Sequence, residues 1–138
     1  MKTYLDSSAY AKRFVEEYGS EDVDAVCGEA SVLVLSVLCL PEIVSAFNRR
    51  LREKKLTRRD YELLKKRLAE EIEDAWIVNL TPGVIEVSVS LLEKNSLRAF
   101  DAIHIACALE SEADLFVSAD KNQIEAARKS GLKILSVA

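Results

Sequence analysis

Residues 98–137, RAFDAIHIACALESEADLFVSADKNQIEAARKSGLKILSV, alternate between helical and strand-like segments. An apolar helix is predicted over Arg98–Glu110 and a short apolar strand over Leu115–Ser118. A second helix follows over Lys121–Ser130, and a second strand over Lys133–Val137. Alternating strands and helices joined by short connections predict a parallel sheet that is covered by helices on both faces.

The preceding part of the chain repeats this alternation. Strands are predicted at Lys2–Leu5, Ser31–Val37 and Trp76–Leu80. The remaining segments are predicted as helices, namely Ser8–Glu17, Glu21–Glu29, one from about Pro41 to Lys54, one capped by Thr57, and Thr81–Lys94. With a length of 138 residues, the pattern predicts one domain, 1–138, of the α/β class, a three-layer α/β/α arrangement around a parallel sheet of about five strands.

Composition excludes several other classes of protein. Hydrophobic residues make up 49% of the chain and charged residues 30%, which is typical of neither a disordered nor a membrane protein. No apolar run approaches the roughly 20 residues of a membrane span, and the opening MKTYLD has no signal-peptide pattern. The three cysteines are predicted to be buried free thiols. We therefore expect a cytoplasmic protein with no membrane contact.

Four acidic residues, Asp6, Glu42, Asp101 and Asp120, lie at separate junctions between strands and helices. Since the loops after parallel strands gather at one edge of a sheet, we expect the four carboxylates to meet in one cleft. Like charges in such a cleft raise one another's pKa, and a hard divalent cation such as Mg²⁺ or Mn²⁺ would relieve that conflict. The pattern favours a metal-dependent hydrolase of phosphodiesters. Taken singly, each acid is better explained as a helix cap, a first-turn acid or a turn acid, and only their convergence on one sheet edge favours the metal site.

Several stretches together form a specific signature: YLDSSAYAKRF near the start, LPEIVSAF in the middle, and LRAFDAIHIACALE followed by LFVSADKNQ. In these stretches the chain resembles the PIN-domain ribonucleases, and most of all the VapC-type toxins of bacterial and archaeal toxin–antitoxin pairs. Asp6, Glu42, Asp101 and Asp120 fall on the four acidic positions of that family. The resemblance implies an endoribonuclease in which these acids are catalytic and hold Mg²⁺ or Mn²⁺.

The same resemblance implies supporting residues and partners. Ser7 and Ser118 fall where small hydroxyl residues support the site. RNA is the implied substrate, a small antitoxin protein the implied inhibitor, and a homodimer the implied assembly. One set of apolar side chains has two open interpretations, a groove for a helix of the antitoxin or part of the core. This set is Tyr10, Phe14, Val15, Val23, Val26, Phe47 and Leu51.

Residues 49–67 are strongly basic, although the formal net charge of the whole chain is −4. Ten basic residues stand against three acidic ones in this segment. One hypothesis is that part of it, including Arg49, Arg52 and Arg58, guides RNA towards the acidic cleft. The alternative is an ordinary solvated helix face.

Other functions on a similar fold remain as alternatives. A response-regulator receiver needs adjacent acids after the first strand, and a haloacid-dehalogenase-like phosphatase needs a second Asp two residues after the first. Here Ser7 and Ser8 follow Asp6. A non-catalytic RNA-binding or interaction module is the alternative from another class. His104, the only histidine, lies one turn after Asp101 and is expected to be a packed helix residue.

Overall fold

A five-stranded parallel sheet forms the centre of the computed structural model, which describes residues 1–138. Its strands are β1 (Lys2–Leu5), β2 (Val32–Ser36), β3 (Trp76–Val78), β4 (Leu115–Ser118) and β5 (Ile134–Ser136). They lie in the order β3-β2-β1-β4-β5, and every neighbouring pair is parallel. The direction in which successive strands are added reverses between β1 and β4, which is where open α/β sheets place their ligand sites.

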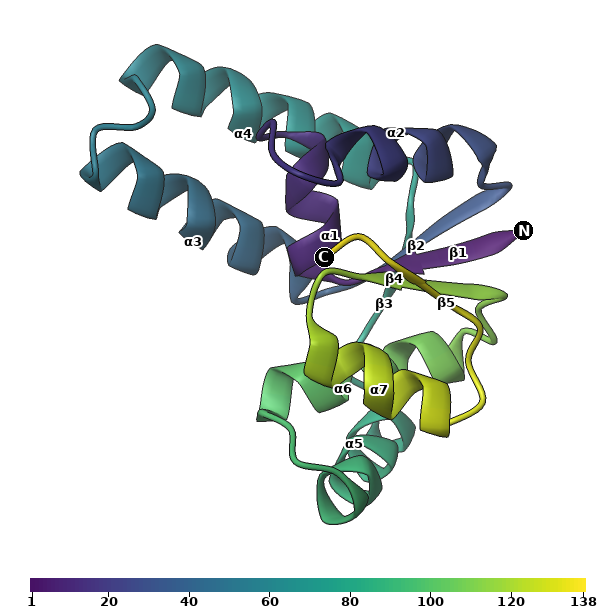
Figure 1. The fold of residues 1–138 in the computed structure, drawn as a ribbon. Helices are drawn as coiled ribbons and strands as arrows, with labels where there is room; N and C mark the ends of the chain where they lie inside the picture. Colours follow the sequence, from purple (N-terminus) through teal and green to yellow (C-terminus); the bar gives the residue numbers. More distant parts are fainter.

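Seven α-helices and one 3₁₀ turn connect the strands. They are α1 (Ser7–Tyr10), the 3₁₀ turn η1 (Ala11–Arg13), α2 (Ser20–Glu29), α3 (Cys39–Arg52), α4 (Arg58–Glu73), α5 (Pro82–Lys94), α6 (Ala99–Glu110) and α7 (Lys121–Lys129). In Figure 1, α1 to α4 cover one face of the sheet and α5 to α7 cover the other. The predicted three-layer α/β/α fold with a parallel sheet is therefore confirmed.

Two hydrophobic cores lie on opposite faces of the sheet, because successive side chains of a strand point to opposite faces. Three neighbouring strands contribute one residue to each core, Tyr4, Val34 and Phe116 towards α5 to α7 and Leu5, Leu35 and Val117 towards α1 to α4. All of these side chains are fully buried. The carboxyl edge of the sheet therefore opens between two packed layers, and residues placed there are held by both.

Local sequence chemistry fixes several helix ends. The hydroxyl of Thr57 accepts from the backbone N–H of Asp60, and that of Thr81 accepts from the N–H of Val84, which confirms both predicted caps. Pro82 occupies the first turn of α5, where its missing N–H costs no hydrogen bond. Helices α3 and α4 form an antiparallel hairpin that projects beyond the sheet (Figure 1).

The predicted helix Ser8–Glu17 is wrong in length. Helix α1 ends at Tyr10, and one 3₁₀ turn carries the chain to Arg13. The guanidinium of Arg13 binds Glu71 of α4 and Asp24 of α2. These contacts with two other helices draw the chain off the helical path, which the local pattern does not encode. Strands β3 and β5 are also shorter than predicted, at Trp76–Val78 and Ile134–Ser136.

Gly19 closes the loop between η1 and α2 in a left-handed conformation, with φ of +91°. A Cβ atom at this position would lie 2.6 Å from the carbonyl oxygen of Val137, so only glycine fits. The loop therefore packs directly against the end of the last strand.

All three cysteines are free, as predicted. Cys39 and Cys107 are buried, and Cys27 is partly exposed. None of the helices combines the length and the apolar character that crossing a membrane would require.

Candidate active site

An acidic pocket of about 580 Å³ lies at the carboxyl edge of the sheet. Three helix N-termini meet there and supply its acids: Glu42 from the first turn of α3, Asp101 from the first turn of α6, and Asp120 from the N-cap of α7. The positive ends of the helix dipoles favour negative side chains at these positions. The lining is completed by Ser7, Ser8, Arg49, Arg98, Ala99, Phe100, His104 and Gln123.

Asp6, the fourth predicted acid, does not line this pocket. Its side chain is fully buried, and it caps α1. Its carboxylate accepts hydrogen bonds from Ser118 Oγ at 2.6 Å, Ser8 Oγ at 2.7 Å and the N–H of Ala9 at 2.9 Å. Burial raises the pKa of Asp6, although nearby His104 and these hydrogen bonds lower part of that rise. Ser8 donates to Asp6 and also lines the pocket, so Asp6 lies directly behind the pocket wall.

Asp101 and Asp120 are close enough for their negative charges to interact. Burial, and then the charge of Asp120, raise the pKa of Asp101 above its ordinary value. Gln123 donates its amide N–H to Asp101 Oδ1 at 3.0 Å, and Arg98 Nε lies 3.9 Å from Asp101 Oδ2. Asp120 accepts from the N–H groups of Asn122 and Gln123, so it also acts as the ordinary cap of α7.

Glu42 is held by a buried chain of polar contacts. His104 Nε2 lies 2.7 Å from Glu42 Oε1, and Ser7 Oγ donates to the same oxygen at 2.8 Å. On the other side of the ring, His104 Nδ1 lies 2.6 Å from the hydroxyl of Tyr4. Burial raises the pKa of Glu42, but the hydrogen bond and charge of His104 and the hydrogen bond from Ser7 outweigh it, so the pKa lies below its usual value. Glu42 is therefore ionised at neutral pH.

His104 and Gln123 were the site residues missed from sequence. His104 is 2% exposed, as a packed helix residue should be, but it also lines the pocket and contacts Glu42. Its position one turn after Asp101 was the available signal. Gln123 lies three residues after Asp120 on α7, which places the two on one side of that helix.

The predicted RNA-binding arginines lie in different places. Arg49 lines the acidic pocket, whereas Arg52 and Arg58 do not. Arg52 ends α3, and Arg58 begins α4, where it pairs with Glu62 at 3.2 Å. Arg52 and Arg58 therefore lie near the tip of the α3–α4 hairpin, away from the acids.

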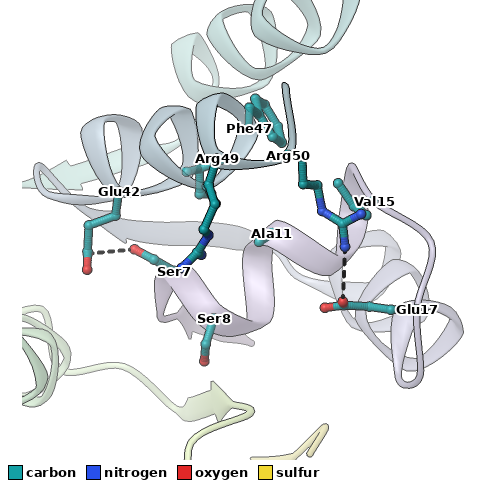
Figure 2. A pocket seen from close by; sticks show the side chains of 11 residues that line it. Ser7, Ser8, Ala11, Val15, Glu17, Glu42, Phe47, Arg49 and Arg50 are labelled. Carbon is teal, nitrogen blue, oxygen red and sulfur yellow. Dashed lines mark hydrogen bonds and ion pairs between the residues drawn. The ribbon is translucent and has the colours of Figure 1, made fainter. Parts of the chain in front are cut away.

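A second, smaller pocket of about 290 Å³ adjoins the first, between α1, η1 and α3. Figure 2 shows Arg49 extending from α3 towards α1, and Arg50 pairing with Glu17 across the pocket. The apolar part of its lining is Ala11, Val15, Ile43, Ala46 and Phe47. We call this pocket the α1–α3 groove.

The two interpretations of the N-terminal apolar side chains can now be compared. Tyr10, Phe14, Val23 and Phe47 are buried in the core beneath α1 to α4. Of the predicted set, only Val15 and Phe47 line the α1–α3 groove. Most of these side chains therefore complete the core, and a groove exists with a different lining.

The oxygen donors of the acidic pocket match the chemistry of a hard divalent cation. Burial first and the charge of Asp120 second raise the pKa of Asp101, and a cation in the pocket would offset both effects. Gln123 Oε1 is a buried oxygen with no hydrogen-bond partner. No three His, Cys, Asp or Glu side chains are grouped so that they could ligate one metal ion in this conformation.

Comparison with known proteins identifies the family. The sequence model of the PIN domain family matches residues 3–129. Ribonuclease VapC45 of Mycobacterium tuberculosis (strain CDC 1551 / Oshkosh) is 30% identical over 113 residues, which cover 77% of this chain and 74% of that protein.

Solved structures share the fold at low sequence identity. A toxin–antitoxin complex from Klebsiella pneumoniae aligns with a TM-score of 0.71 and 14% identity, covering 99% of this chain and 98% of that chain. VapC20 of Mycobacterium tuberculosis, a sarcin-ricin loop cleaving toxin, aligns with a TM-score of 0.69 and 15% identity, covering 94% and 95%. With a family model that spans most of its length and a VapC ribonuclease as a relative, this chain belongs to the PIN domain family and is of the VapC ribonuclease type.

Proposed function

We propose that residues 1–138 act as one domain, a metal-dependent endoribonuclease that hydrolyses RNA phosphodiesters as the toxin of a toxin–antitoxin pair. The observation that carries this proposal is the meeting of Glu42, Asp101 and Asp120 in one pocket with Asp6 directly behind it. The ribonuclease activity of the VapC relatives supports the same reaction. A cytoplasmic location follows from the proposal, because its substrate is found there.

Asp101, Asp120 and Glu42, the acids that line the pocket, would hold Mg²⁺ or Mn²⁺, with Asp6 behind the wall adding negative charge. The ion would lower the pKa of a bound water and neutralise charge on the scissile phosphate. Neighbouring groups of the chain hold two of these carboxylates in fixed orientations. Gln123 fixes the orientation of Asp101, while Asp120 is fixed by the backbone N–H groups at the start of α7.

The other two acids have distinct local roles. Glu42 remains ionised, because His104 and Ser7 both support its charge, so it can accept a hydrogen bond from an attacking water and orient it. Asp6 places a buried negative charge behind the pocket, and Ser118 and Ser8 hold its carboxylate in one orientation.

Positive charge at the rim favours the approach of a polyanion to this acidic pocket. Arg49 on α3 and Arg98 at the start of α6 both line it. We assign Arg49 the first contact with phosphate on this surface. Arg52 and Arg58 would extend the same basic path along the hairpin.

We also propose two protein partners. A small antitoxin would seat a peptide in the α1–α3 groove, where the side chains of Glu17, Arg49 and Arg50 offer charges of both signs around an apolar floor. The toxin–antitoxin complex among the structural neighbours supports this partner. The second partner is another copy of the chain. Ile85, Val89 and Leu92 form an exposed apolar stripe at helical spacing on α5, which suits a homodimer contact.

A cleavage assay tests the central proposal. Labelled total RNA is incubated with purified protein in Mg²⁺, in Mn²⁺ and in EDTA, with the wild type and with Asp101→Asn. Cleavage should require the ion and fall at least about 100-fold in the variant, since a carboxylate of the ion site is lost. Glu93→Gln, an exposed acid on α5, is the matched control and should cleave normally.

Two results would count against the proposal. Undiminished cleavage by Asp101→Asn protein in EDTA would exclude the mechanism. RNA binding without any cleavage in either metal would instead favour the non-catalytic RNA-binding module.

A further inference from the structure

Phe100 is the one phenylalanine that the fold leaves in solvent. Its side chain is 52% exposed, whereas Phe14, Phe47 and Phe116 are at most 7% exposed. It lies in the first turn of α6, directly before Asp101. An exposed aromatic ring carries no function by itself, so the significance of Phe100 depends on its place beside the acids.

The ring of Phe100 belongs to two adjoining hollows. It lines the acidic pocket, and it also lines a neighbouring depression of about 390 Å³ with Leu38, Pro41 and Ser45. Glu42 lines both hollows as well. An apolar surface with a few polar groups is thus continuous with the acids.

This combination suits a nucleobase. A base presents an apolar face for stacking on an aromatic ring and a polar edge for hydrogen bonds. Ser45 contributes a hydroxyl with no hydrogen-bond partner within the chain, and Glu42 contributes an acceptor. Arg49 and Arg98 lie in the adjoining acidic pocket, where the phosphates on either side of such a base would pass.

We propose that Phe100 is a stacking platform for one base of single-stranded RNA, next to the phosphate that is cleaved. This inference rests on the proposed ribonuclease function and adds to it a position at which a base, rather than the backbone, is contacted. A protein that covered Phe100 would also cover Glu42 and close the acidic pocket, because both residues line both hollows. We assign the surface to RNA because it is continuous with the acids that would cleave RNA, and binding of a protein there is an alternative outcome of the test.

Binding measurements without cleavage test the inference. A fluorescent 12-nucleotide oligouridylate is titrated in EDTA with wild type, Phe100→Ala, Phe100→Leu and Phe100→Trp. Its length lies within the roughly 4–16 nucleotides that one small domain contacts. Loss of one stacked base should weaken binding of the Ala and Leu variants by roughly 5- to 100-fold, and Trp should retain affinity. The salt dependence should not change, because no charge is lost.

Two controls separate stacking from other effects. An oligonucleotide of equal length with abasic sites should bind all four proteins equally. Trp76→Ala removes a 44% exposed aromatic at the amino end of β3, the opposite edge of the sheet, and should leave RNA binding unchanged.

Three outcomes would overturn the inference: unchanged oligouridylate binding by Phe100→Ala, an equal loss with the abasic strand, or a loss that follows dissociation of a dimer in sedimentation velocity. The cleavage assay on the same proteins keeps the two proposals apart. If the wild type cleaves RNA and Phe100→Ala binds it normally, only the stacking role fails. If the wild type neither binds nor cleaves RNA, the ribonuclease proposal fails with it.

Discussion

Removing the hydroxyl of Tyr4 should test the buried polar chain that reaches Glu42. The Tyr4 hydroxyl lies 2.6 Å from His104 Nδ1, and the carboxylate of Glu42 lies 2.7 Å from Nε2. Because Glu42 is ionised and only accepts, Nε2 must carry a proton, and the Tyr4 hydroxyl, which can donate or accept, is the hydrogen-bond partner of Nδ1. Tyr4→Phe keeps the aromatic ring that stacks on Phe116 and removes only this hydroxyl.

The expected cost follows from burial. Tyr4 is fully buried and His104 is 2% exposed, so no water replaces the lost partner of Nδ1. Leaving one buried polar atom unpaired costs about 1–3 kcal/mol, so we expect a decrease of about 2 kcal/mol in the free energy of unfolding. For 138 residues that corresponds to a fall in Tm of about 7 °C.

Urea titration and calorimetry of four proteins measure this: wild type, Tyr4→Phe, His104→Leu and the double variant. The two groups contact each other, so the two costs should not add, and the coupling should be about 1–2 kcal/mol. RNA cleavage by Tyr4→Phe should fall about tenfold, because His104 loses the contact that fixes its orientation towards Glu42. A cost of Tyr4→Phe below about 0.5 kcal/mol, or costs that add without coupling, would refute the proposed chain of contacts.

Three further predictions concern charge and assembly. The raised pKa of Asp101 means that ionisation of this carboxylate destabilises the fold. The free energy of unfolding of the metal-free protein should therefore decline as pH rises through the folded-state pKa of Asp101. Asp101→Asn should flatten this decline in urea titrations, and an unchanged pH profile would contradict the prediction. Arg49→Gln should lower RNA affinity and reduce the slope of log affinity against log salt concentration by about 0.7. Arg52→Gln and Arg58→Gln should have smaller effects on both quantities. If the three variants have equal effects, or none, the basic segment is a solvated helix face. Val89→Asp, at the centre of the α5 stripe, should give a monomer in sedimentation equilibrium if the wild type is a dimer, and a monomeric wild type would defeat the dimer prediction.

Features of the fold that depend on neighbouring residues were predictable from sequence. The strand Leu115–Ser118 was predicted with its observed bounds, since an apolar run between two turns has few other solutions. The caps at Thr57 and Thr81 follow from a hydroxyl three residues before an N–H that needs an acceptor. The length of α1 was not predictable, because Arg13 is held by helices that come later in the chain.

The features of the candidate active site also fall into those that local sequence predicts and those that depend on tertiary packing. That acids follow β1 and β4, and open α3 and α6, is a property of local junctions and could be predicted. That Asp6 is fully buried while Asp101 lines a pocket depends on how the layers close around the sheet edge. The contact of His104 with Tyr4 joins residues 100 positions apart, and no local periodicity encodes such a pair.

The bond between Ser118 and Asp6 spans 112 positions of the chain and has a consequence for synthesis on the ribosome. Strand β1 is central, yet one of its two neighbours, β4, is translated more than a hundred residues later. At roughly 5–20 residues per second, on the order of ten seconds separate the two. Until β4 is translated, the chain lacks both the pocket edge and the hydrogen bond from Ser118 that holds the carboxylate of Asp6. An unfinished chain therefore lacks the acidic pocket, and the pocket is complete only when translation of the chain is nearly finished.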